Sequence, residues 1–321
     1  MRFLTEFFNS GTVNQQNKRR LGALVIAVTA ALLAVALIVL MVASIVTAVK
    51  NNRVADDESE GDGEGGIPSG YTTTTLADGQ ASNGALLLID AAHPYVGTET
   101  LVQPAPGVRP VDENNQMLYK GDYQDVNITQ ETLDAFHAMV QDFHEAQKAD
   151  ESYKVGGFWL QSLLRPGVEL SADTAAVVGS GYALIFFDQY LDRSIYDSEA
   201  KTGVGVYKWI YENAHKYGFI RVSNAEGEEN IFRYVGVAHA TYIVNNKTTF
   251  AAYLETLKTK TSVSKSISIP VTDAKNQKVT YRVYYLASDA EITVPEKYSY
   301  TVSGDNMGGY IVTVDQSSAK K

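Results

Sequence analysis

The sequence predicts an α+β fold that follows a single N-terminal transmembrane helix. An uncharged run of 29 residues, 21–49, predicts the transmembrane helix. Helical periodicity in the middle of the chain predicts the α part. A change to a period of two after Val263 predicts antiparallel strands in the C-terminal part.

The uncharged run 21–49 is long enough to cross a bilayer, which takes roughly 20 apolar residues. The apolar part of a signal peptide is shorter, about 7–15 residues, so we interpret the run as a retained anchor. Nearly every face of such a helix is apolar, which excludes a buried amphipathic helix.

The charges on either side of the run predict the orientation of the anchor. Arg19 and Arg20 precede it, and an acidic stretch that begins at Asp56 follows it. Basic residues remain on the cytoplasmic side of a membrane. We therefore expect a single-pass cell-membrane protein with a cytoplasmic tail, 1–20, and an extracellular ectodomain.

Residues 50–84 are acidic and rich in small residues, with few apolar groups. Such a composition buries too little surface to offset the entropy of ordering, so we expect a flexible linker. The ectodomain is then expected over 85–260. A C-terminal β-hairpin region, 261–321, is expected to pack on it.

Apolar periodicity predicts the main elements of the ectodomain. The run LLLID, which starts at Leu86, is typical of a buried strand. Helices are predicted over 127–148, 204–217 and 248–257, the first capped by Asn127 or Thr129. The inward face of the first helix is expected to hold Leu133, Phe136, Met139, Val140 and Phe143.

Two β-hairpins are predicted near the C-terminus. Apolar residues alternate with polar ones from Val263 to Val271 and from Val279 to Tyr285, around the turn sequence DAKNQ. A second hairpin is predicted from 298–302 and 310–314, around the sequence SGDNMGG.

The composition excludes some classes of function. The formal net charge is −10 and no aromatic-rich nucleic-acid motif occurs, so nucleic acid is not expected as a partner. The chain has no cysteine, so an exported domain depends on its hydrophobic core and not on disulfides.

Several stretches together resemble VanY-type D-alanyl-D-alanine carboxypeptidases of Gram-positive bacteria, over roughly 85–315. They are LLLIDAAHPY, the helix before KVGGFW, WIYENAHKYGFI, RYVGVAHATYIV and YSYTVSGDNMGGYIVTV. The resemblance implies a cell-wall zinc peptidase that removes the terminal D-Ala from peptidoglycan stem peptides.

The chemistry of that family rests on an HxxGxAxD motif and a later ExWH motif. They supply two histidines and one aspartate to zinc, and a glutamate that acts as general base. Three protein ligands plus a water are what a hydrolytic zinc site needs. An arginine usually holds the carboxylate of the substrate.

In this chain Gly181–Ala183 matches the centre of the first motif, and four functional positions are lost. The zinc histidine falls on Val178 and the zinc aspartate on Ile185, while Gly236 stands for the glutamate and Trp159 for the arginine. The resemblance leaves His239 as the residual metal-ligand position. Aliphatic side chains have no lone pair to donate to a metal.

We therefore interpret the ectodomain as a pseudo-peptidase without catalytic residues or cofactor, which binds stem peptides or an envelope protein. Its candidate groove residues are Phe158, Trp159, Gly181, Tyr182 and Tyr234.

Two alternatives stay open. One is an active D,D-carboxypeptidase with a rebuilt zinc site from Asp188, His215 and His239, and with Arg165 as substitute carboxylate clamp. The other is a structural scaffold subunit of an envelope complex.

Overall fold

The computed structural model describes residues 67–121, 126–149, 158–161, 170–188, 196–197, 202–203, 207–222, 230–287 and 291–319. The predicted cytoplasmic tail, the predicted transmembrane helix 21–49 and the first part of the predicted linker lie outside these ranges. Among the described helices, none is long and apolar enough to cross a membrane.

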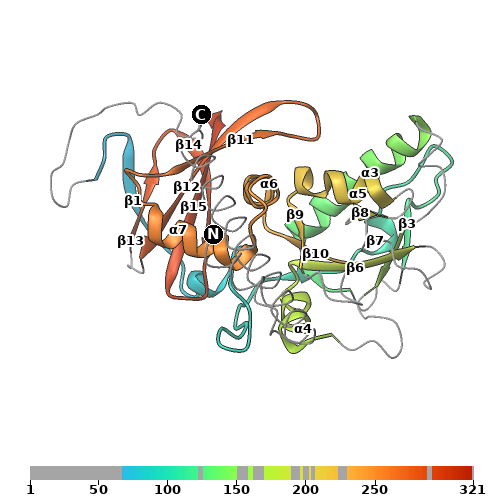
Figure 1. Cartoon of the computed structure of the whole chain (residues 1–321), viewed down its shortest axis with the longest axis horizontal. Helices are drawn as coiled ribbons and strands as arrows, with labels where there is room; N and C mark the ends of the chain where they lie inside the picture. Colours follow the sequence, from blue (N-terminus) through green and yellow to red (C-terminus); the bar gives the residue numbers. More distant parts are fainter. Residues whose placement is uncertain are drawn as a thin grey trace, which may run out of the picture. The chain divides into compact units, whose positions relative to one another are not determined.

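A five-stranded mixed sheet is the main sheet of the region before the C-terminal strands (Figure 1). Its strands, in spatial order, are β3 (Tyr119–Gly121), β5 (Phe158–Gln161), β6 (Ala183–Asp188), β10 (Ile231–Tyr234) and β9 (Phe219–Arg221). All neighbouring strands are antiparallel, as predicted, except the edge pair β3 and β5, which is parallel.

Alternate residues of the sheet pack into two different cores. Leu184 and Phe232 face helix α3 (Gln130–Ala149), α5 (Lys208–Asn213) and the 3-10 helix η5 (Ala214–Tyr217). The α3 core includes Tyr119, Leu133, Phe136, Phe143, Leu184, Ile210, Phe219 and Phe232. The opposite face carries the α4 core, named after helix α4 (Ala172–Gly179) and formed by Leu87, Ile89, Val177, Ala183, Ile185 and Ile231. Figure 1 shows α3 and α5 on one side of the sheet and α4 on the other.

Helix α3 confirms the prediction over 127–148. The five residues expected on its inward face are all buried. Thr129 is the cap, because its hydroxyl accepts a hydrogen bond from the backbone N–H of Thr132 at 3.3 Å. The predicted periodicity therefore fixed the face that the helix presents to the sheet.

Two other predicted helices are present and two more were not predicted. The helix expected over 204–217 corresponds to α5 and η5, and Gly218 ends it with φ at 89°. Helix α7 (Phe250–Lys260) begins at the Thr249 cap. Helices α4 and α6 (Val237–Asn245) are short and rich in small or apolar residues, so they show no clear period.

The C-terminal part forms a four-stranded antiparallel sheet, in which the two predicted hairpins are joined by the pairing of β12 with β15. Its strands, in spatial order, are β11 (Ile267–Thr272), β12 (Lys278–Ala287), β15 (Gly309–Ala319) and β14 (Tyr298–Gly304). Both predicted hairpins are confirmed. One face of the sheet packs on α6 and α7 in the α7 core, which includes Ala238, Tyr253, Leu254, Leu257, Ile269, Val271, Val283 and Ile311.

The prediction of a flexible linker over 50–84 is wrong for its last part. Residues Tyr71–Thr75 form strand β1, which pairs with β13 (Glu291–Pro295) in an antiparallel ladder. Tyr71 also packs edge-on against Tyr284 of β12, with ring centroids 6.2 Å apart. The β-branched threonines favour an extended backbone even though they are polar.

The prediction of a strand at LLLID is also wrong. Leu86, Leu87 and Ile89 are buried, but no neighbouring strand pairs with this segment among the described residues. Its backbone bonds to side chains and turns instead: the N–H of Leu86 donates to the Ser303 hydroxyl at 3.0 Å. The apolar run therefore predicted correctly that these side chains are buried, but it predicted wrongly that their backbone pairs with a strand.

The remaining elements are short. They are the pair β2 (Leu101–Val102) and β4 (Ile128–Thr129), the pair β7 (Tyr196–Asp197) and β8 (Thr202–Gly203), and the 3-10 helices η1 (Gln80–Ser82) and η2 (Pro106–Val108).

Candidate functional site

The first motif lies at the turn between α4 and β6. The Ser171 hydroxyl caps α4 by accepting from the N–H of Thr174, and Ser180 closes the helix by donating to the Val177 carbonyl at 2.7 Å. Gly181 then turns the chain into β6 with φ at 81°, and a Cβ there would lie 2.4 Å from a methyl carbon of Leu101. The turn between α4 and β6 therefore requires glycine at position 181, whether or not a metal is bound.

The two ligand positions of this motif lie in hydrocarbon. Val178 packs against the α4 core, and Ile185 is one of its members with no exposed surface. Ile185 has two direct cross-strand neighbours, Ile231 on β10, which also has no exposed surface, and Gln161 on β5, whose side chain lies outside the description. Side chains in such pairs lie about 4.5–5.5 Å apart at Cβ, so Ile231 is close enough to share a ligand with position 185.

His239 lies elsewhere, on α6. Its Nδ1 is 2.7 Å from the Tyr253 hydroxyl of α7, and its Nε2 is 2.8 Å from the Thr313 hydroxyl of β15. A neutral imidazole has one donor and one acceptor nitrogen, so both are used. Burial lowers the pKa of His239 to about 3, which keeps the ring neutral.

Of the four predicted positions, only Gly236 is seen beside His239, because a Cβ built on it would lie 3.6 Å from the imidazole ring. Val178 and Ile185 pack in the α4 core, and the Trp159 side chain lies outside the description. Gly236 has φ at 83° and ψ at 151°, a backbone conformation that is essentially restricted to glycine. A glutamate would be strained at this position. Gly236 therefore meets a requirement of the backbone at the start of α6.

His239 leads to a prediction about pH. Because the folded pKa is about 3 and the unfolded value about 6.5, only the unfolded state takes up this proton as the pH falls between them. The free energy of unfolding should fall by about 1.4 kcal/mol per pH unit in this window from this group alone.

Urea unfolding of the wild type and of His239→Gln at pH 7 and pH 5 measures this contribution. We expect the variant to be less stable at pH 7 and to lose less stability on acidification. Equal losses in the two proteins would contradict the prediction.

The predicted groove residues fall into two groups. Gly181, Tyr182 and Tyr234 lie together, because the N–H of Tyr234 donates to the Tyr182 carbonyl at 2.7 Å. The Tyr182 hydroxyl donates to Glu99 at 2.8 Å, and burial is the main reason that the pKa of this tyrosine is raised. Phe158 and Trp159 lie on β5 opposite Asp188 and Phe187, and their side chains are outside the description.

The residues proposed for a rebuilt metal site are not placed as one. Within the described residues, no three His, Asp or Glu side chains are positioned to share a metal ion. His215 lies on η5, and burial, followed by the nearby Lys216, lowers its pKa. The side chain of Asp188 and all of Arg165 lie outside the description.

Sequence reasoning missed Arg233, which organises this region. Its guanidinium is buried, donates to the carbonyls of Ala85 and Leu87, and lies 4.1 Å from the ring centroid of Phe250. Burial lowers the pKa of Arg233 to about 9, so it stays charged at neutral pH. The signal was an arginine inside the apolar strand IFRY, because a buried cation needs acceptors nearby.

The fold is similar to that of a solved bacterial enzyme. The chain superposes on the vancomycin-resistance D,D-dipeptidase VanXYg, solved with a D-Ala-D-Ala phosphinate analogue. The TM-score is 0.53 and the identity 16%, over 77% of this chain and 99% of that one. VanYB in complex with D-alanine-D-alanine gives a TM-score of 0.31 at 18% identity, over 54% of this chain and 98% of that one.

A sequence relative is a D-alanyl-D-alanine carboxypeptidase from Enterococcus faecium. It is 33% identical over 117 residues, which are 33% of this chain and 36% of the relative. The match therefore spans about a third of the relative's length. No family model matches the chain. The resemblance to VanY-type D-alanyl-D-alanine carboxypeptidases, predicted from the sequence, is confirmed.

Proposed function

We propose that this protein is a membrane-anchored, VanY-like pseudo-peptidase of the bacterial envelope that binds and does not hydrolyse. The observation that carries the proposal is the α4 core. Val178, Ile185 and the facing Ile231 fill the region of the first metal-binding motif with hydrocarbon. Burial of aliphatic side chains stabilises the fold and leaves no lone pair for a metal.

The geometry supports a different register for the second motif. Position 185 has two cross-strand neighbours, Gln161 and Ile231, and only Ile231 lies near the second motif in the sequence. A second zinc histidine beside position 185 would therefore fall on Ile231 and not on His239. The spacing of ExWH then assigns the tryptophan to Asn230 and the glutamate to Glu228, which lies outside the described residues. In this register the general base could be retained, while both histidines and the aspartate are replaced.

Zinc does not fit the described residues in either register. In the first, His239 is the remaining ligand, and hydrogen bonds occupy both its nitrogens. In the second, the three ligand positions are Val178, Ile185 and Ile231. A hydrolytic zinc site keeps three protein ligands, so neither set supports one.

The proposed anchor and ligand follow from the sequence. The anchor is the uncharged run 21–49, with its basic residues on the cytoplasmic side. The proposed ligand is a peptidoglycan stem peptide or an envelope protein. Pull-down with purified muropeptides separates these two, and capture by neither muropeptides nor envelope extracts would leave only the scaffold role.

The decisive experiment measures metal and activity together. The full chain, purified in neutral detergent, is expected to hold substoichiometric zinc by elemental analysis and to release no D-Ala from a pentapeptide. Water without a metal keeps a pKa far above neutral and is a poor nucleophile at neutral pH. One zinc per chain with chelator-sensitive release would overturn the proposal, and Asp188, His215 and Glu228 would then be the first residues to replace.

A further inference from the structure

Basic residues are concentrated in one short part of this acidic chain. Between Lys258 and Arg282 there are six lysines and arginines and a single acid, Asp273, although the whole chain has a net charge of −10. The basic residues are Lys258, Lys260, Lys265, Lys275, Lys278 and Arg282. The net charge of this segment is therefore positive, whereas the net charge of the whole chain is negative.

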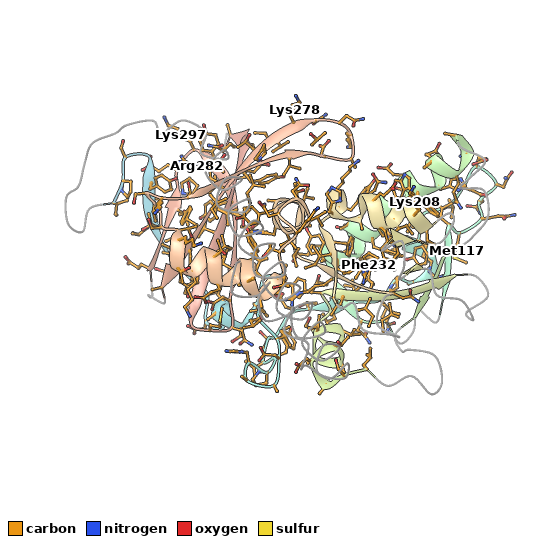
Figure 2. The ribbon with its side chains drawn as sticks, viewed as in Figure 1. Met117, Lys208, Phe232, Lys278, Arg282 and Lys297 are labelled. Atoms are coloured by element: carbon orange, nitrogen blue, oxygen red, sulfur yellow. The ribbon has the colours of Figure 1, made fainter. Side chains whose placement is uncertain are left out.

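Some of these basic residues lie at the end of the β11–β12 hairpin, which extends past the part of β12 that pairs with β15. The pairing of β12 with β15 stops at Tyr281, whereas its pairing with β11 continues to Lys278. The end of the hairpin is therefore a two-stranded arm, residues 270–280, and Lys275 and Lys278 are exposed on it. Figure 2 shows Lys278 and Arg282 along this hairpin.

The acid in this segment does not neutralise the arm. One carboxylate oxygen of Asp273 accepts the N–H groups of Lys275 and Gln277, at 2.9 and 2.8 Å, and so shapes the turn. Among the ion pairs between described residues, none includes Lys275 or Lys278. Two ammonium groups therefore remain available to a partner.

Protection of an edge strand against aggregation does not explain the charge. That role places lysine or proline on the edge strand itself. The edge strand here is β11, which has Pro270 and no charged residue. Solubility does not explain it either, because a net charge of −10 already provides repulsion between molecules.

We propose that the β11–β12 arm is a docking surface for a linear polyanion with phosphodiester-type charges. Lys275 and Lys278 are exposed on the arm. Arg282 follows them on β12, where it is half-buried and its Nε donates to the Ser266 hydroxyl at 3.0 Å. A linear series of anions can meet the two lysines and reach the remaining nitrogens of the guanidinium. Binding would release counterions from the polymer and should therefore weaken as salt rises. The acidic remainder of the chain would restrict the polymer to this arm.

The test compares two variants of the full chain in neutral detergent that change the net charge equally. Lys275→Gln/Lys278→Gln removes two positive charges from the arm. Lys208→Glu makes the same change in net charge on α5, where Lys208 is exposed and its Nζ lies 3.6 Å from Oε1 of Glu212. The probe is a linear polyphosphate, with inorganic phosphate as the monomeric control. Figure 2 labels Lys208 on α5, apart from the hairpin.

We expect the arm variant to bind polyphosphate about tenfold more weakly than the wild type, with a shallower salt dependence and unchanged melting temperature. Lys208→Glu should bind like the wild type. Equal losses in both variants would overturn the proposal in favour of a net-charge effect. Stronger binding to vesicles of equal parts phosphatidylcholine and phosphatidylglycerol than to polyphosphate would overturn it in favour of a lipid surface. These outcomes do not depend on zinc or D-Ala release.

Discussion

Ile185→Asp is expected to destabilise the folded domain by more than about 4 kcal/mol and not to restore metal binding. The side chain of Ile185 has no exposed surface and faces Ile231. Truncation of a buried isoleucine costs about 2–5 kcal/mol, and an unpaired carboxylate in hydrocarbon adds several more. Domains are stable by only about 5–15 kcal/mol, so the variant should be partly or wholly unfolded.

Ile185→Val is the matched control, because it keeps the position apolar. It is expected to cost about 0.5–1.5 kcal/mol. Unfolding in urea, followed by circular dichroism, compares the three proteins. A folded Ile185→Asp protein with stoichiometric zinc would mean that the α4 core can open to admit a metal.

Phe136→Ala is expected to lower the free energy of unfolding by about 3–5 kcal/mol. Phe136 is fully buried in the α3 core, and its ring lies edge-on to Tyr119, with centroids 5.0 Å apart. Its removal leaves a cavity where α3 meets the sheet. Urea unfolding again gives the measurement.

Gln141→Ala provides the control on the same helix. Gln141 is exposed, and such substitutions usually stay within about 0.5 kcal/mol. Similar effects in the two variants would show that α3 contributes through its helical propensity and not through the apolar face.

Periodic patterns predicted the elements that bury one face. Helix α3 and both C-terminal hairpins follow directly from their apolar spacing. Apolar residues that face the core recur every three to four residues in a helix and every second residue in a strand. Helix α6 was missed because Val237–Asn245 is apolar or small on several sides. A short segment of this kind gains its structure from the two layers that enclose it.

Tertiary contacts decided the segments that were predicted incorrectly. LLLID has the composition of a buried strand, but Arg233 and Ser303 take its backbone groups. The strand at Tyr71–Thr75 has no apolar alternation, and its partner is far away in the sequence. Local composition contains no information about such partners.

Sequence reasoning could not fix the register of the second motif. The Gly181–Ala183 match lies at the turn from α4 to β6, although the sequence predicted neither element. Which residue stands opposite Ile185 depends on how β6 pairs with β10, and a motif of four letters does not specify strand pairing. His239 matches the histidine of the ExWH motif, but it lies beside Tyr253 of the α7 core and not in the α4 core.

The ladder between β1 and β13 has a consequence for the order in which this protein assembles. Thr73 pairs with Thr293, so the first described strand leaves the ribosome long before its partner exists. At about 5–20 residues per second, the delay is roughly 10–40 s. An unpaired apolar strand would be prone to self-association during this time. The four threonines of β1 make the strand polar until β13 has been synthesised, and they still favour an extended backbone.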